Sequence, residues 1–68
     1  MNEDTIKGSW KQFRGEMKKA WANITDDEFT YADGQRDKLE GLIQERYGRS
    51  REQAQEEVDR FFKDRAGN

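Results

Sequence analysis

Four basic residues in the first third of the chain follow the spacing of one helical edge, at intervals of four, three and four positions. Residues at these spacings lie on the same side of an α-helix. A row of cations could contact the phosphates of a nucleic-acid backbone, with binding that weakens as salt rises. This basic stripe, the candidate site for an anionic partner, consists of Lys7, Lys11, Arg14 and Lys18.

A second interpretation of the basic stripe is structural. A charged row on an amphipathic helix is usually its solvated face, and here it could pair with the acidic run at residues 26–28. The whole chain is also acidic, with a net charge of -2 and a pI of about 5.1, whereas nucleic-acid-binding domains are usually basic. We therefore prefer the solvated face and keep nucleic-acid binding as the alternative.

The acidic clusters are explained by helix structure and not by a metal or acid–base site. Asp26, Asp27 and Glu28 are adjacent, so their side chains point in different directions, and the spacing of a calcium-binding loop is absent. Helix capping accounts for this run. Glu56 and Glu57 are expected to lie on a solvated face, since nothing nearby in sequence separates their pKa values. We expect no bound metal.

The composition excludes most catalytic schemes. The chain has no cysteine and no histidine, so disulfides, thiolate or imidazole metal ligands and the usual nucleophile–base pairs are absent. Glycine-rich phosphate loops and nucleophile elbows are also missing from the sequence. We predict no catalytic residues, no cofactor and no enzymatic activity.

Hydropathy gives no sign of a membrane segment. The longest apolar run is Ala20–Ala22, far too short to span a bilayer, and the first residues are acidic and polar where a signal peptide would be basic and then apolar. We expect a soluble cytoplasmic protein with no membrane partner.

A helix must carry the basic stripe, because apolar residues recur beside it with the period of a helix face. These are Ile6, Trp10, Phe13, Met17 and Trp21. The pattern predicts a helix over about residues 5–21, capped by Asp4 or Thr5. Both tryptophans fall on the apolar face, so we expect them in the core and not stacked on bases.

Capping signals divide the rest of the chain into three more helices, over about residues 26–32, 35–47 and 51–65. Thr25 and Glu28 form a capping box, flanked by Ile24 and Phe29 at the positions of a hydrophobic staple. Gly34 is expected to end the second helix.

The last two helices have their own signals. Gly48 is expected to end the third helix, and Ser50 with Gln53 to begin the fourth. No segment alternates with period two, so the fold class is all-α. We predict one domain over residues 1–68, four short helices folded back as hairpins in a small bundle.

The supply of core residues is thin, because charged residues make up 41% of the chain and apolar ones 31%. We expect a modestly stable monomer, or a domain that gains stability by weak self-association. Gly8, Gly15 and Ala22 are seven apart, on the side of the first helix opposite the aromatic residues. They could be a docking strip for another helix, although we prefer to interpret them as plain surface.

Residues spread over nearly the whole chain match the pattern of one known family. They are Gly8–Gln12, Gly15–Lys18, Thr25–Asp27, Gly34–Arg36, Leu39, Gly41, Ile43–Gln44, Arg46–Gly48, Ala54, Val58–Asp59 and Phe62. In these residues the chain resembles the CsbD-like family of small hydrophilic bacterial stress-response proteins. The resemblance implies four helices in two crossed hairpins and induction under stress, with no established catalytic or ligand-binding residues. We expect a non-enzymatic stress-response protein with a weak protective or binding role. The alternative is a nucleic-acid-binding module that uses the basic stripe.

Overall fold

The computed structural model of the chain describes residues 7–65, apart from the side chains of Lys7, Ser9 and Arg65. The described range is all-α, as predicted, and contains no β-strand. In chain order its helices are α1 (Lys7–Ala20), α2 (Asp26–Ala32), α3 (Arg36–Tyr47) and α4 (Arg51–Arg65). The expected start of the first helix at residue 5, its cap at Asp4 or Thr5, and Ile6 all lie outside the described residues.

Side chains three positions apart begin α2 and α4, as the sequence predicts. The Glu28 backbone N–H donates to Thr25 Oγ1 at 3.2 Å, and the Thr25 backbone N–H donates to Glu28 Oε1 at 3.0 Å. Ser50 and Gln53 make the same reciprocal pair at 3.1 and 3.0 Å. These bonds satisfy backbone donors that have no partner within the helix, which fixes where each helix begins.

Left-handed residues end α2 and α3. Gly48 (φ 65°) is the C-cap of α3, as predicted. α2 ends at Ala32, as predicted, but its C-cap is Asp33 and not the predicted Gly34. Asp33 already adopts the left-handed conformation (φ 51°), one residue before Gly34 (φ 76°). Aspartate enters this region more readily than most residues, since its short side chain can hydrogen-bond locally. α3 begins at Arg36, one residue after the predicted Gln35.

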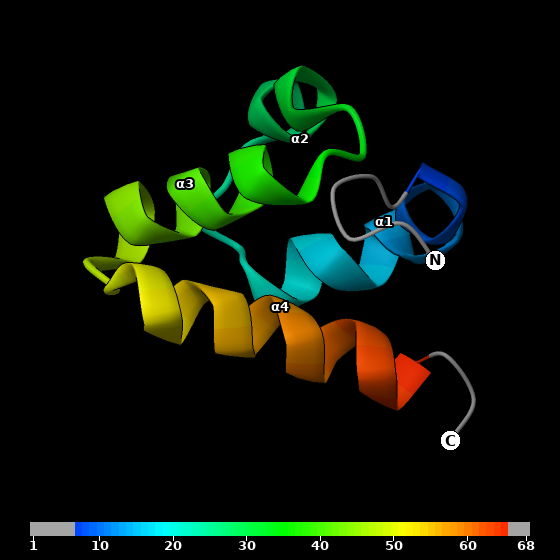
Figure 1. The fold of residues 1–68 in the computed structure, drawn as a ribbon. Coiled ribbons are helices and arrows are strands. Elements are labelled where there is room, and N and C mark those ends of the chain that lie inside the picture. The colour runs from blue at the N-terminus through cyan, green and yellow to red at the C-terminus, as the bar shows by residue number, and fades with distance from the viewer. Residues whose placement is uncertain (1–6, 66–68) are drawn as a thin grey trace.

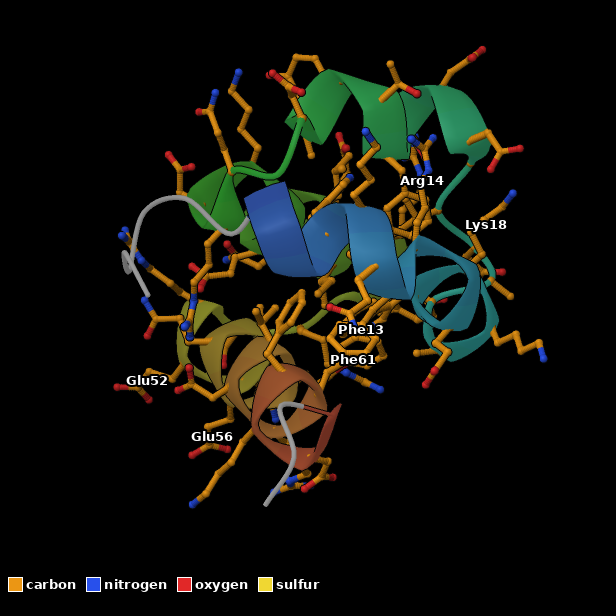
Figure 2. The ribbon with its side chains drawn as sticks, turned by 90° about the vertical axis from the view of Figure 1, so that its right-hand side faces the viewer. Phe13, Arg14, Lys18, Glu52, Glu56 and Phe61 are labelled. Carbon is orange, nitrogen blue, oxygen red and sulfur yellow. The ribbon has the colours of Figure 1, made fainter. Side chains whose placement is uncertain are left out.

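The four helices form two crossed pairs. In Figure 1, α3 and α4 lie side by side across the view, whereas α1 and α2 run toward the viewer. A quarter turn exchanges these directions, and Figure 2 shows α1 between α2 and α4. α3 packs closely against both α4 and α2. Within its pair, α1, which carries the basic stripe, lies alongside the acidic α2.

Large side chains of all four helices fill the space between the pairs. Trp10 and Trp21 are only 5% and 4% exposed, which confirms that both tryptophans belong to the core. Phe13 is partly buried and packs against this core, and Figure 2 shows it beside Phe61 between α1 and α4. The other buried apolar residues are Met17, Ile24, Phe29, Ala32, Leu39, Leu42, Ile43, Ala54, Val58, Phe61 and Phe62.

Candidate functional site

The basic stripe faces α2 at two of its four positions. Arg14 is half-buried, and its Nη2 atom donates to the backbone oxygen of Asp26 and to Thr30 Oγ1, both at 2.9 Å. Lys18 Nζ lies 2.6 Å from Asp26 Oδ1. Figure 2 shows Arg14 extending from α1 toward α2. These two cations therefore already have acceptors within the fold.

The other two positions of the stripe differ. Lys11 is exposed, and no carboxylate within residues 7–65 forms an ion pair with it. The side chain of Lys7 lies outside the described atoms, so the structure places only its backbone at the start of α1. Lys11 is thus the described member of the stripe whose charge is directed to solvent.

Opposite charges on neighbouring segments account for the contact between α1 and α2. Residues 7–25 contain five basic side chains and one acidic one, whereas α2 begins with Asp26, Asp27 and Glu28 and has no basic residue in its last turn. The hydrogen bond from Lys18 lowers the pKa of Asp26 below its ordinary value of 3.8; desolvation opposes this change, and the charges of Lys18 and Arg14 add to it. The Asp26 carboxylate therefore stays ionised to lower pH.

The acidic run at the start of α2 has structural partners. Glu28 closes the capping box, and it also pairs with Arg46 of α3, whose Nε atom lies 3.3 Å from Glu28 Oε1. Asp26 pairs with Lys18 of α1. The run therefore caps its own helix, as the capping interpretation predicts, and also links it to α1 and to α3.

Glu57 was expected on a solvated face, and this prediction is wrong. Its Oε1 accepts from the Trp21 indole Nε1 at 3.2 Å, and its Oε2 accepts from Arg49 Nε at 2.6 Å. The side chain is half-buried, because α4 places it against the segment that follows α1. Glu56 is exposed, as predicted, and Figure 2 shows it extending away from α1.

Arg36 forms a second link that periodicity did not reveal. Its guanidinium bonds to Glu40 Oε2 at 2.7 Å, to the Gln55 backbone oxygen at 3.2 Å and to the Asp59 carboxylate, so it joins α3 to α4. Burial alone would lower the pKa of Arg36, but the hydrogen bonds to Glu40 and Asp59 outweigh this effect and raise the pKa. Only its spacing of four from Glu40 was a signal in the sequence.

The sequence also did not reveal a hollow between α1 and α2. It has a volume of about 350 Å³ and lies where the basic stripe meets the aromatic core. Its lining combines apolar, cationic, hydroxyl and carboxylate groups, from Trp10, Lys11, Arg14, Phe29, Thr30 and Asp33. This is the place on the described surface where α1 offers both a cavity and an accessible cation.

Two further properties of the described residues concern metal binding and the membrane. Among residues 7–65, no three or more carboxylate, thiol or imidazole side chains gather in a way that could hold a metal ion. Within the same range, each helix is too short or too polar to cross a bilayer.

Four short helices around an aromatic core, joined on the surface by ion pairs, define a small hydrophilic all-α domain. The CsbD-like family model matches residues 4–56 of this chain. The chain is 55% identical over 62 residues to a UPF0337 protein of Bordetella pertussis, covering 91% of this chain and 94% of that protein. It is 51% identical over 63 residues to the UPF0337 protein YjbJ of Escherichia coli O6:H1, covering 93% and 91% of the two chains. The chain therefore belongs to the CsbD-like family of small stress-related proteins.

Proposed function

We propose that this protein is a non-enzymatic, hydrophilic stress-response protein that protects or binds other macromolecules through weak polar contacts, with the cytoplasm as its place of action. One observation carries the proposal. Among the described residues, Tyr31 is the single large apolar side chain that is well exposed, at 64%. Stable protein interfaces usually need a central apolar or aromatic cluster, so a surface of this kind favours weak, exchangeable association.

The distribution of charges supports the same proposal. Several charged side chains are engaged within the fold: Arg46 of α3 pairs with Glu28 of α2, and Arg49, in the connection before α4, pairs with Glu57 of α4. Others are exposed and form no ion pair within the described residues, among them Lys19, Glu52 and Glu56. Exposed, well-hydrated charges of both signs suit contacts with many partners at low affinity.

A protection assay tests this function. A labile oligomeric enzyme is dried or frozen and thawed with increasing amounts of the protein, and the recovered enzyme activity is measured. The matched variant, Lys19→Gln/Glu52→Gln/Glu56→Gln, removes exposed unpaired charges and changes the net charge by one unit. Circular dichroism should show an unchanged fold for this variant.

We expect the wild-type protein to preserve activity in proportion to its concentration, and the triple variant to preserve clearly less. Recovery no better than with an equal mass of serum albumin would contradict the proposal. Equal protection by wild type and variant would show that the exposed charges are not responsible.

Nucleic-acid binding through the basic stripe remains the second candidate, and its support is the row of cations itself. Arg14 and Lys18 already bond to α2, so a phosphate backbone would have to compete with Asp26 for them. This competition reduces the charge that the stripe can offer, and we therefore rank this candidate second.

Retention on an immobilised duplex or single strand separates the two candidates. A general protectant should pass through near physiological ionic strength, whereas a nucleic-acid binder should be retained and then released by salt. Charge reversal in the control variant is best confined to Lys7→Glu/Lys11→Glu, because reversing Arg14 or Lys18 would also disturb the α1–α2 contact.

A further inference from the structure

The hollow between α1 and α2 has the composition of a small-ligand site. Its volume of about 350 Å³ falls at the lower end of the range for ligand pockets, roughly 300 to 1,000 Å³. Such pockets typically combine an apolar base with a few convergent polar groups. The six lining residues of this hollow divide in the same way.

Two aromatic rings form the apolar base. Trp10 of α1 and Phe29 of α2 meet edge to face, with ring centroids 5.8 Å apart and planes at 65°. Phe29 is fully buried and Trp10 is 5% exposed, so both rings are held by the core. Since Phe29 has no exposed surface, the apolar contact that a ligand can reach is the exposed part of Trp10, which the core holds in place at little ordering cost.

The rim carries two cations and a hydroxyl. Arg14 is fixed by its bonds to the Asp26 backbone oxygen and to Thr30 Oγ1. These bonds use one of its three nitrogens, and the guanidinium has five N–H donors in total. Because Thr30 Oγ1 accepts from Arg14, its own proton is free to be donated outward. Lys11 adds a mobile ammonium group, exposed at the edge of the hollow.

The balance of charge at the rim favours an anion. The lining has two positive charges, on Lys11 and Arg14, and one negative charge, on Asp33. The guanidinium, ammonium and hydroxyl groups are all donors suited to carboxylate or phosphate oxygens. The aromatic base suits a flat ring. We propose that this hollow binds a small flat anion, a single aromatic ring system that bears a carboxylate or a phosphate group.

The size of the hollow limits the occupant to one ring system with its anionic group. A polymer would instead have to follow the whole basic stripe, and Lys18 of that stripe is outside the lining and paired with Asp26. The site therefore shares Lys11 and Arg14 with the nucleic-acid interface considered above but takes a smaller occupant, and it does not depend on the protective function.

The two tryptophans make the site directly testable by NMR. Trp10 lines the hollow, whereas the Trp21 indole bonds to Glu57 at the far end of α1, so it serves as an internal control. The ¹⁵N-labelled protein is titrated at low salt with adenosine 5′-monophosphate and, separately, with benzoate. Adenosine and benzamide, which keep the rings and lack the anionic group, are titrated in parallel.

We expect a saturable shift of the Trp10 indole signal with at least one anion, at roughly millimolar concentration or below, while the Trp21 signal stays in place. Binding by one anion alone would identify whether the site takes carboxylates or phosphates. The neutral compounds should shift Trp10 little at the same concentrations.

A matched pair of variants assigns the effect to the rim. Lys11→Gln should weaken binding by about fivefold, the size expected for one exposed charge contact. Lys19→Gln, on the same helix and outside the hollow, should leave affinity unchanged. An unmoved Trp10 signal with both anions in a folded protein would overturn the proposal. Equal shifts with the neutral compounds, or equal affinities in the two variants, would do the same.

Discussion

One chemical change, glycine to alanine, should stabilise this protein at Gly15 and destabilise it at Gly48. Gly15 lies in the interior of α1, is exposed, and a Cβ built on it meets nothing within 4 Å. Gly48 also has open space around it, but its φ of 65° is one that alanine rarely adopts. The two substitutions therefore add the same methyl group without a clash and differ in backbone conformation alone.

The expected magnitudes follow from this difference. Alanine is favoured over glycine in a helix interior, and part of the gain comes from a less flexible unfolded chain, so Gly15→Ala should raise the free energy of unfolding by about 0.5 to 1 kcal/mol. At Gly48 the left-handed conformation costs alanine about 1 to 2 kcal/mol, which exceeds the gain from the unfolded state. Gly48→Ala should therefore lower the free energy of unfolding by about 1 kcal/mol.

Thermal and urea unfolding followed by circular dichroism would measure both changes. A domain of this size shifts its Tm by roughly 4 to 8 °C for each kcal/mol, so the two variants should melt on opposite sides of the wild type. A fall in stability with Gly15→Ala would refute the reasoning, because it would mean that the space beside Gly15 is filled. Loss of concentration dependence in the melt would then point to the strip of Gly8, Gly15 and Ala22 as a docking face.

Three further predictions address the cap, the α1–α2 contact and the core. Thr25→Ala should remove the capping box and lower the free energy of unfolding by about 1 kcal/mol, while Thr25→Ser keeps most of it; chemical denaturation checks this. Because the pKa of Asp26 is lowered, its stabilising contribution is complete above its ordinary value of 3.8 and is lost as pH falls through the lower folded value. A carboxyl-detected NMR titration should show this low pKa, and Lys18→Gln should return it toward 3.8. Val58→Ala should cost about 2 kcal/mol or more, since Val58 is fully buried; a loss below about 0.5 kcal/mol in urea unfolding would show a poorly packed core.

Features that depend on nearby residues could be predicted from the sequence. The capping boxes of Thr25 with Glu28 and of Ser50 with Gln53 each need two residue types three positions apart, and both appear in the structure. Helical periodicity likewise placed the tryptophans in the core. Within such short distances the backbone geometry of one helix determines which side chains meet.

Features that depend on helix packing could not be predicted. Glu57 meets the Trp21 indole across 36 positions, a contact set by how the two pairs of helices cross. Arg36 meets Asp59 across 23 positions, a contact set by how α3 packs against α4. The spacing of the basic stripe gave its alignment on α1 but not the partners of Arg14 on α2. The hollow could not be predicted from the sequence either, because residues of both α1 and α2 line it.

The separate surroundings of the two indoles give the molecule a pair of independent optical reporters. The fluorescence of Trp10 reports on the contact between α1 and α2, where its ring meets Phe29. The fluorescence of Trp21 reports on the contact with α4, where its ring meets Phe61. Variants that keep one tryptophan, with the other replaced by phenylalanine, would show in stopped-flow refolding which of the two contacts forms first. The order in which this small bundle assembles can thus be timed without any added label.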